Sequence, residues 1–289
     1  MTGYTGDPQQ RRLCGGAQPG IELTDWCGTG PPLLFVHGFS HNRQVWRDVA
    51  EGLAERFRPI ALDLRGHGDS GWCPEARYAP ADLADDLLRV LDALEIERVI
   101  AVGHSLGGIA ATLFATAHPD RVRALALVDT GPALKLGGME FVARDVSASF
   151  RSYDSRQEFF ELLRATLRFA PDACVARLAE ATLVERIDGR FEPKLDPGWL
   201  QTPTDPEMGP DLETQLWSSL ESLTCPVLLV RGGVSAMLDA EVARAMIGRI
   251  PGDARLVTIE KAGHSVMLDA GLELLRVLDE SLDRWCGSA

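Results

Sequence analysis

The segment Gly103-His104-Ser105-Leu106-Gly107-Gly108 decides the fold of this 289-residue chain. It follows a short apolar run at residues 98–102, which predicts a buried strand, and it precedes residues 109–118, which predict a helix. A serine on such a sharp turn exposes its hydroxyl at a helix N-terminus, as nucleophiles do in Gly-x-Ser-x-Gly segments. The bare pattern also fits a tight turn with a capping serine. The flanking strand and helix favour Ser105 as a nucleophile.

Apolar runs of strand length recur along the chain and alternate with segments of helical period. Leucines share one helical face within residues 83–94 and again within residues 272–282. Continuous apolar strands between such helices predict an α/β fold with a doubly wound, mostly parallel sheet. In this architecture ligands bind at the carboxyl ends of the strands. The six predicted strands are residues 33–36, 59–62, 98–102, 124–128, 227–230 and 256–259.

The alternation of strands and helices stops between residues 132 and 223. Helical patterns continue there without an intervening strand, which predicts an inserted helical cap or lid. Prolines between residues 193 and 210 predict an irregular binding loop at its end. The α/β core is then residues 21–131 and 224–289, with residues 21–26 as at best a short edge strand. Residues 1–20 are predicted to form a poorly ordered leader.

The composition excludes several classes of partner. A formal net charge of -13 repels nucleic acids and anionic membrane surfaces. The six cysteines form no C-x-x-C pair, so we expect free thiols in a reducing compartment rather than a zinc or redox site. Residues 99–117 carry no charge, but glycines interrupt them, so a strand, a turn and a buried helix explain them better than a membrane span. We therefore expect a cytoplasmic monomer or homodimer that acts on a small molecule without a metal or cofactor.

Three further motifs accompany the serine segment in a characteristic order. Residues 34–39 read Leu-Phe-Val-His-Gly-Phe, residues 63–70 read Asp-Leu-Arg-Gly-His-Gly-Asp-Ser, and Gly263-His264 stands near the end. With these motifs the chain resembles the α/β-hydrolase superfamily from about residue 21 to the C-terminus. The resemblance implies an oxyanion loop, a glycine-rich loop and a late catalytic histidine at these three places.

The resemblance also implies that the backbone N–H groups of Phe39 and Leu106 form the oxyanion hole. A residue at the start of a helix has a free N–H group, and a second donor completes the pair. Removing one such donor costs roughly a hundredfold to a thousandfold in rate. His37 is interpreted as scaffolding for the oxyanion loop.

His264 is the candidate general base because it follows the last predicted strand and comes after the serine in the family's chain order. The other histidines have structural or pocket explanations: His104 in the elbow, His67 in the glycine-rich turn, His118 at a helix end, and His41 at the pocket mouth. The H-x-x-x-H spacing of residues 37 and 41 would suit a metal on a helix. Gly38 and the missing third ligand make that spacing a coincidence.

The catalytic acid is the point where the sequence departs from the family. Many relatives place an Asp at the end of Arg-Gly-x-x-Ser-Asp, but residues 231–236 end in Ala236. Asp129, directly after a predicted strand, is the preferred substitute, although it could instead brace the turn that follows it. Asp239 is the alternative acid and reads better as a helix N-cap. A chain without an acid would lose about ten-thousandfold in turnover.

These residues predict a serine hydrolase that cleaves a carboxylic ester or lactone of a small hydrophobic substrate through an acyl-enzyme intermediate. We expect the pocket walls to come from the cap, Phe39, Trp46 and Met139, with His37 and His104 beside them. A cofactor-free oxygenase or a carbon-carbon bond hydrolase is the alternative on the same fold. A weakly catalytic or non-catalytic ligand-binding protein is the second alternative, suggested by Ala236.

Overall fold

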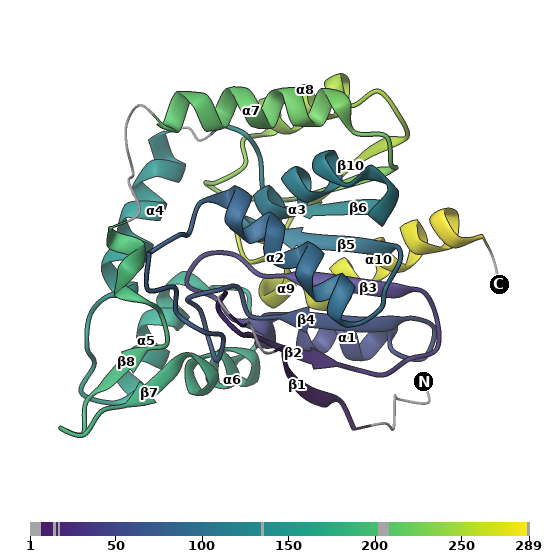
Figure 1. Ribbon diagram of the computed structural model, residues 1–289. Helices are drawn as coiled ribbons and strands as arrows, with labels where there is room; N and C mark the ends of the chain where they lie inside the picture. The colour runs from purple at the N-terminus through teal and green to yellow at the C-terminus, as the bar shows by residue number, and fades with distance from the viewer. Residues whose placement is uncertain (1–6, 14–15, 17, 134–135, 202–207, 288–289) are drawn as a thin grey trace.

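The computed structural model describes residues 7–13, 16, 18–133, 136–201 and 208–287, and its centre is an eight-stranded sheet (Figure 1). The strand order in these residues is β1-β2-β4-β3-β5-β6-β9-β10. From β4 to β10 all neighbouring strands run parallel. The parallel strands are β3 (Pro32–Val36), β4 (Arg58–Leu62), β5 (Val99–His104), β6 (Val122–Val128), β9 (Val227–Gly232) and β10 (Ala254–Ile259). The six predicted strands and the parallel sheet are confirmed.

Two antiparallel strands extend the sheet on the β4 side. β2 (Ile21–Asp25) pairs with β4, and β1 (Gln9–Leu13) pairs with β2. The prediction of a poorly ordered leader is therefore wrong for Gln9–Leu13, because these residues form the outermost strand; residues 1–6, 14–15 and 17 lie outside the described part. β2 is covered by β1 and is not an edge strand. Arg11 and Arg12 on β1 place charge on an edge that would otherwise invite pairing with another chain.

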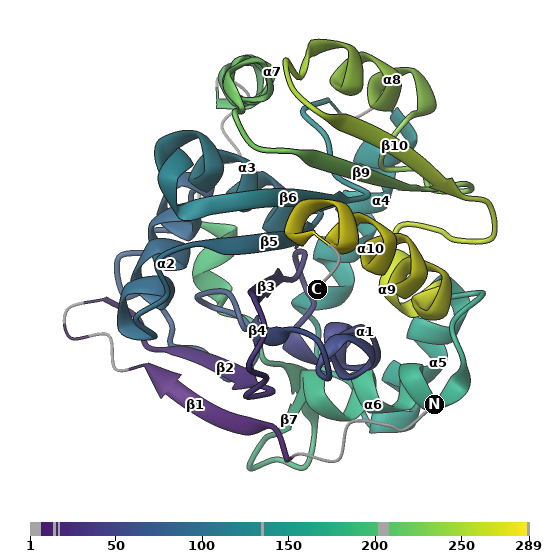
Figure 2. The same ribbon diagram turned by 90° about the vertical axis from the view of Figure 1, so that its right-hand side faces the viewer.

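Helices cover both faces of the sheet and bury separate apolar clusters (Figure 2). α2 (Pro80–Ala93), α3 (Leu106–Ala117) and α8 (Ala240–Arg249) pack on one face. The opposite face is covered by α1 (Arg47–Leu53), α9 (Val266–Asp269) and α10 (Gly271–Cys286). The first cluster includes the predicted leucine stripe of α2, with Leu83, Leu87 and Leu91 buried.

A cap stands at one end of the sheet, on the left in Figure 1. It contains α4 (Leu136–Ser149), α5 (Arg156–Thr166), α6 (Asp172–Thr182) and a small hairpin of β7 (Leu183–Glu185) and β8 (Phe191–Pro193). The hairpin was not expected from the helical periodicity. The cap has its own small apolar cluster, in which Tyr153 and Phe159 make an edge-to-face contact.

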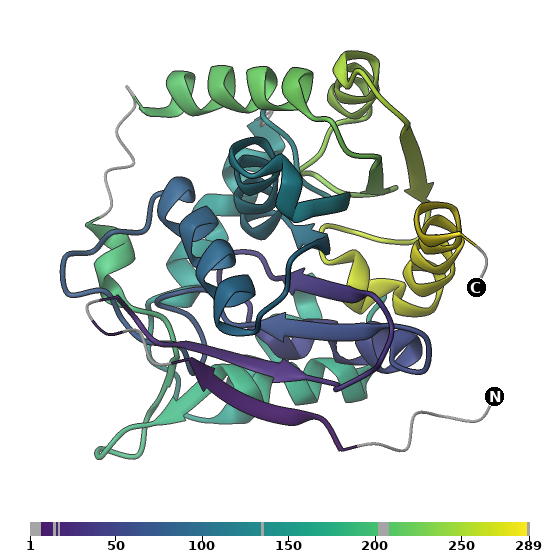
Figure 3. The ribbon, with the colours of Figure 1, turned by 45° about the vertical axis from the view of Figure 1, so that its right-hand side comes forward.

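The predicted cap boundary at residue 223 is too late. α7 (Met208–Ser222) lies beside α3 and α8, as Figure 3 shows, and its Leu216 and Leu220 are buried in the same cluster as α2 and α3. α7 therefore belongs to the core layer, and the cap ends before it. Periodicity alone could not show this, because a core helix and a cap helix have the same amphipathic pattern.

The uncharged stretch at residues 99–117 forms β5 and α3, as predicted. β5 is a central strand of the sheet and α3 packs on one of its faces, so burial in the core explains the apolar composition. Within the described ranges, no helix combines the length and the apolar character that crossing a membrane requires.

Candidate active site

Ser105 lies on a strained turn between β5 and α3. Its φ of 51° and ψ of -121° lie in a region that non-glycine residues rarely adopt. The turn is possible because Gly103 and Gly107, two residues before and after Ser105, lack side chains. A Cβ atom on Gly103 would come within 2.5 Å of the Gly107 carbonyl oxygen, and a Cβ on Gly107 within 2.4 Å of the His37 carbonyl oxygen. The two glycines of the pattern are therefore required by close backbone contacts.

The oxyanion loop lies directly against the serine. A Cβ atom on Gly38 would approach Ser105 Cβ to 2.9 Å and His104 Nδ1 to 2.7 Å, so only glycine fits there. This contact brings Phe39, the next residue, to the nucleophile. The N–H groups of Phe39 and Leu106 donate no hydrogen bond within the part of the chain that the structure describes. Two free donors beside a serine are what an oxyanion hole requires.

His264 and Asp129 are hydrogen-bonded to each other. His264 Nδ1 lies 2.8 Å from Asp129 Oδ2, and both side chains are almost fully buried. The Gly232 N–H donates to Asp129 Oδ1 at 2.8 Å, and the Ser235 hydroxyl donates to Oδ2. A carboxylate so fixed makes Nδ1 the protonated nitrogen of His264, which leaves Nε2 free to accept a proton.

His264 lies beside the nucleophile turn. Its ring centroid is 4.5 Å from that of His104, the residue that precedes Ser105. His104 Nε2 donates to the His264 carbonyl oxygen at 3.0 Å, and the Gly263 N–H donates to Asp269 Oδ2 at 2.8 Å. Burial lowers the pKa of His104 well below its usual value, so His104 acts here as a neutral donor. These contacts fix the loop that carries His264.

The two other positions considered for the acid lie away from His264. Asp239 is the N-cap of α8 and accepts a hydrogen bond from the Glu241 N–H at 2.8 Å, as its sequence context predicted. Ala236 faces the cap, because a Cβ on Gly137 would lie 3.8 Å from its Cβ. The loop after β9 still contributes to the site, since Ser235 supports Asp129. Asp129 is thus the carboxylate that contacts the histidine.

Four of the predicted pocket residues lie elsewhere. Trp46 is fully buried in the core against Phe35, with ring centroids 5.2 Å apart, because its helix packs its apolar side onto the sheet. Met139 is 59% exposed and faces solvent. His37 is a scaffold, accepting from the Leu64 N–H at 2.9 Å and donating to the Gly38 carbonyl. His104 lies beneath His264, as described above.

Aromatic side chains take the place of the predicted pocket walls. Phe39 contacts Trp199 edge-to-face at 5.4 Å and Phe150 at 6.4 Å between ring centroids. Phe141 of α4 contacts His264 edge-to-face at 5.3 Å. Met139 was expected at the pocket because it is an apolar residue of the cap, but Phe141, two residues later, contacts the histidine and Met139 is exposed to solvent.

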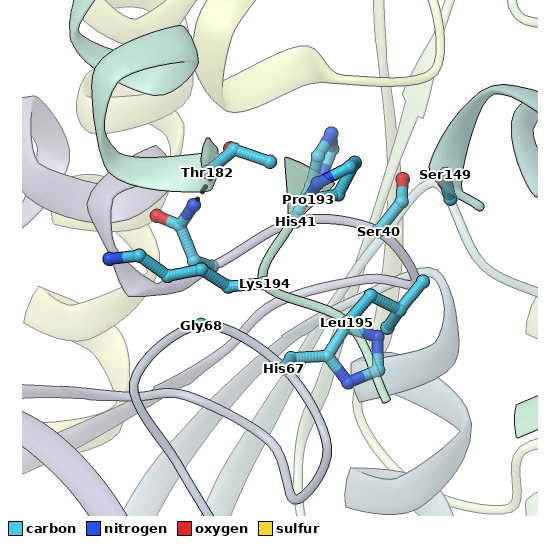
Figure 4. A pocket seen from close by; sticks show the side chains of 10 residues that line it. Ser40, His41, His67, Gly68, Ser149, Thr182, Pro193, Lys194 and Leu195 are labelled. Atoms are coloured by element: carbon cyan, nitrogen blue, oxygen red, sulfur yellow. Dashed lines mark hydrogen bonds between the residues drawn. The ribbon is translucent and has the colours of Figure 1, made fainter. Parts of the chain in front are cut away.

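The glycine-rich loop holds the cap to the core. The Gly68 N–H donates to the Lys194 carbonyl and the Asp196 N–H donates to the Gly66 carbonyl, at 2.8 and 2.9 Å. Asp69 accepts from Lys194 Nζ at 2.7 Å. These contacts enclose a cavity of about 10 Å³ behind the oxyanion loop (Figure 4). Its lining comes from the core at Ser40, His41, His67 and Gly68 and from the cap at Ser149 and other residues. It has room for about one water molecule.

The three histidines around the oxyanion and glycine-rich loops, His37, His41 and His67, are neutral. Burial lowers the pKa of His37 and of His41 to about 3, and it lowers the pKa of His67 well below its usual value. No group of three or more His, Cys, Asp or Glu side chains among the described residues is arranged to hold a metal ion. The spacing of His37 and His41 is accordingly explained by scaffolding and stacking, since His41 stacks on His104 at 5.4 Å.

A family model described as alpha/beta hydrolase fold matches residues 31–271 of this sequence. The chain is an α/β-hydrolase. This hydrolase is 30% identical over 279 residues to the esterase Rv0045c of Mycobacterium tuberculosis, covering 96% of this chain and 90% of that protein. It is also 30% identical over 254 residues to a putative 2-succinyl-6-hydroxy-2,4-cyclohexadiene-1-carboxylate synthase of Bacillus subtilis, covering 86% and 89%. The crystal structure of E-2-(acetamidomethylene)succinate hydrolase superposes with a TM-score of 0.85 at 26% identity, covering 96% of this chain and all of that one.

Besides the aromatic side chains, three polar residues of the site were not predicted from the sequence. Ser40 and Asp145 form a hydrogen bond beside the oxyanion loop, and Ser235 supports Asp129. Phe141, Asp145 and Ser149 recur every four residues on α4, and this spacing could have identified one inward face carrying an acid. The sequence offered no signal for the partner, because Ser40 is 105 residues away.

Proposed function

We propose that Ser105, His264 and Asp129 are the nucleophile, general base and acid of a hydrolase that cleaves carboxylic esters or lactones. The observation that carries this proposal is the hydrogen bond of 2.8 Å between His264 Nδ1 and Asp129 Oδ2 next to the nucleophile turn. It supplies the orienting carboxylate that Ala236 fails to supply.

The reaction proceeds by acyl transfer. His264 Nε2 takes the Ser105 proton while the serine oxygen attacks the carbonyl carbon, and the resulting oxyanion accepts hydrogen bonds from the Phe39 and Leu106 N–H groups. The imidazolium then protonates the leaving alcohol, and an acyl-enzyme remains. His264 next removes a proton from water, and the hydroxide attacks the acyl carbon; the imidazolium then returns its proton to Ser105 as the carboxylic acid is released. Asp129 stabilises the imidazolium in both steps.

The surroundings support a small, largely apolar substrate. Phe39, Phe141, Phe150 and Trp199 bring aromatic surface to the site, and such walls bind acyl and aromatic groups. The 30% identity to a mycobacterial esterase supports ester hydrolysis. The identity to a putative synthase shows that relatives on this fold are not all named as esterases, and carbon-carbon bond hydrolysis stays the second candidate. Both reactions place the base at His264.

Fluorophosphonate labelling and ester turnover test the proposal together. We expect the native chain to label at Ser105 and to release p-nitrophenol from p-nitrophenyl butyrate, whereas Ser105→Ala should do neither. Turnover in Ser105→Ala should fall about 10⁴-fold or more, because the remaining site only binds and polarises the carbonyl. Rapid labelling without turnover of any ester or lactone would favour the carbon-carbon reaction. Absence of both would leave a ligand-binding protein.

A further inference from the structure

One face of α4 runs from the catalytic histidine toward the cavity behind the oxyanion loop. Phe141 on this face contacts the His264 ring. Four residues later, both oxygens of Asp145 accept from the Ser40 hydroxyl, at 2.9 and 3.0 Å. Ser149, one turn further, lines the cavity together with Ser40 (Figure 4). Asp145 is therefore held between the base on one side and the oxyanion loop on the other.

Asp145 has more acceptor capacity than its surroundings use. An ionised carboxylate offers about four acceptor positions. Within the described residues its side chain receives a hydrogen bond from one hydroxyl, that of Ser40. Burial raises the pKa of Asp145 to about 6, so the group is mainly ionised at pH 7. Arg144, the next residue, is exposed and lies over the Phe141 ring; its charge and that of His264 act on Asp145 and partly offset the effect of burial on its pKa.

The position of Asp145 is set by residues of the proposed site. Ser40 directly follows Phe39, the proposed oxyanion donor, and its φ of 61° holds it in a turn. A substrate carbonyl bound in the proposed oxyanion hole would lie next to this turn, because Ser40 follows Phe39 directly. A partly buried acceptor at that place interacts more strongly with a polar group on the substrate than an exposed one does, because less water competes.

We propose that Asp145 and Ser40 form a polar subsite that accepts a hydrogen bond from a hydroxyl or ammonium group on the acyl part of the substrate and rejects a carboxylate there. The proposal rests on the proposed function and specifies its substrate class. A hydroxylated acyl chain satisfies the free acceptor positions of Asp145. An acyl chain ending in a carboxylate faces like-charge repulsion in a poorly solvated place, which is a strong means of discrimination.

The alternative is that Asp145 only ties the cap to the oxyanion loop. In that case Asp145→Asn would change the hydrolysis of all esters by one common factor. Subsite recognition predicts unequal changes, so the informative quantity is the ratio of kcat/KM values between two esters. Any effect on the shared catalytic steps cancels in this ratio.

Three methyl esters of similar length test the subsite: methyl butyrate, methyl 3-hydroxybutyrate and monomethyl succinate, each followed by methanol release. We expect the native enzyme to prefer the hydroxy ester over the succinate by more than about tenfold. Asp145→Asn should reduce this ratio by about tenfold or more. Glu140→Gln, which removes one negative charge from the solvent side of α4, should leave the ratio unchanged.

The pH dependence of the same ratio adds a second readout. The discrimination should be full above pH 7 and should decline as the pH falls through about 6, where Asp145 takes up a proton. The charges of His264 and Arg144 act on Asp145 in all three reactions, and His41 beside Ser40 stays neutral because burial lowers its pKa to about 3. A common factor for all three esters in Asp145→Asn would overturn the subsite while leaving the proposed hydrolase intact. If the native chain cleaves none of the esters and Ser105 does not label, the proposed function itself fails.

Discussion

The core wall and the cap wall of the active site are built in different ways. On the core side, Asp129 is held by a backbone N–H and a hydroxyl, and His264 is held through its own carbonyl and the neighbouring Gly263. On the cap side, α4 meets the site through side chains, namely the Phe141 ring on His264 and the Asp145 carboxylate on Ser40. Backbone contacts fix positions more narrowly than single side-chain contacts do, since rotamers can change.

This difference separates two tasks. The core wall sets the geometry of proton transfer, where an error of 1 Å costs about a hundredfold in rate. In the proposed reaction the cap wall would set which acyl groups fit, and it contacts the histidine through the Phe141 ring. The cavity behind the oxyanion loop is about 10 Å³, whereas small-molecule sites measure roughly 300–1,000 Å³. This cavity alone is therefore too small to hold a substrate.

The largest effect is expected from the core wall, in Asp129→Asn. The amide cannot stabilise the imidazolium and favours the wrong tautomer, so kcat should fall about 10³- to 10⁴-fold. Steady-state ester hydrolysis measures the loss. Asp239→Asn is the matched control, because it changes the alternative acid and keeps a good N-cap. Full activity in Asp129→Asn would remove this residue from the reaction and end the contrast between the walls.

Gly38→Ala tests the contact between the oxyanion loop and the turn that carries Ser105. The new Cβ would meet Ser105 Cβ at 2.9 Å and the His104 ring at 2.7 Å, so the loop must shift and carry the Phe39 N–H away from the oxyanion. We expect kcat to fall roughly a hundredfold with little change in KM, as for loss of one oxyanion donor. Gly248→Ala, in open space on α8, is the control. Equal kinetics in the two variants would contradict an oxyanion role for this loop.

Acid stability should report on the buried histidines under the cap. The folded pKa of His41 is about 3, below its unfolded value near 6.5, so the unfolded chain binds the proton first. The stability from neutral burial is complete above pH 6.5 and is lost as the pH falls toward 3, by up to about 1.4 kcal/mol per pH unit for each histidine. Urea denaturation at pH 7, 6 and 5 measures this slope. His41→Gln should lower it by about one proton; an unchanged slope would mean that His41 is hydrated or charged in the fold.

The smallest effect is expected where the cap touches α1 at the surface. Arg177 of α6 pairs with Asp48 at 2.6 Å, but both side chains are partly exposed, so water and salt weaken the pair. Arg177→Ala should lower the free energy of unfolding by less than about 1 kcal/mol and leave kcat/KM unchanged. Arg190→Ala, which breaks a pair within the cap, is the comparison. A fall of several kcal/mol for Arg177→Ala alone would show that the cap wall is fixed as firmly as the core wall.

The two walls also differ in how well the sequence predicts them. The predicted strands ending at Val128 and Val102 follow from local apolar runs, so the positions of Asp129 and Ser105 could be inferred from chain order. Trp46 and Met139 were assigned to the pocket wrongly, because an aromatic or thioether side chain gives no local sign of which side of its helix faces a core. Asp145 and Ser40 depend on the docking of α4, which involves contacts between residues far apart in the chain.

The alanine at position 236 has a consequence for engineering. If Asp129, directly after β6, is the acid as proposed, the segment after β9 contributes to the reacting groups only through Ser235, and it lies against the first turn of α4 near Gly137. Libraries randomised at positions 234, 236 and 237 would therefore reshape the approach to the site while the reacting groups stay in place. Natural substitutions in this segment can likewise change substrate preference without changing the reacting groups.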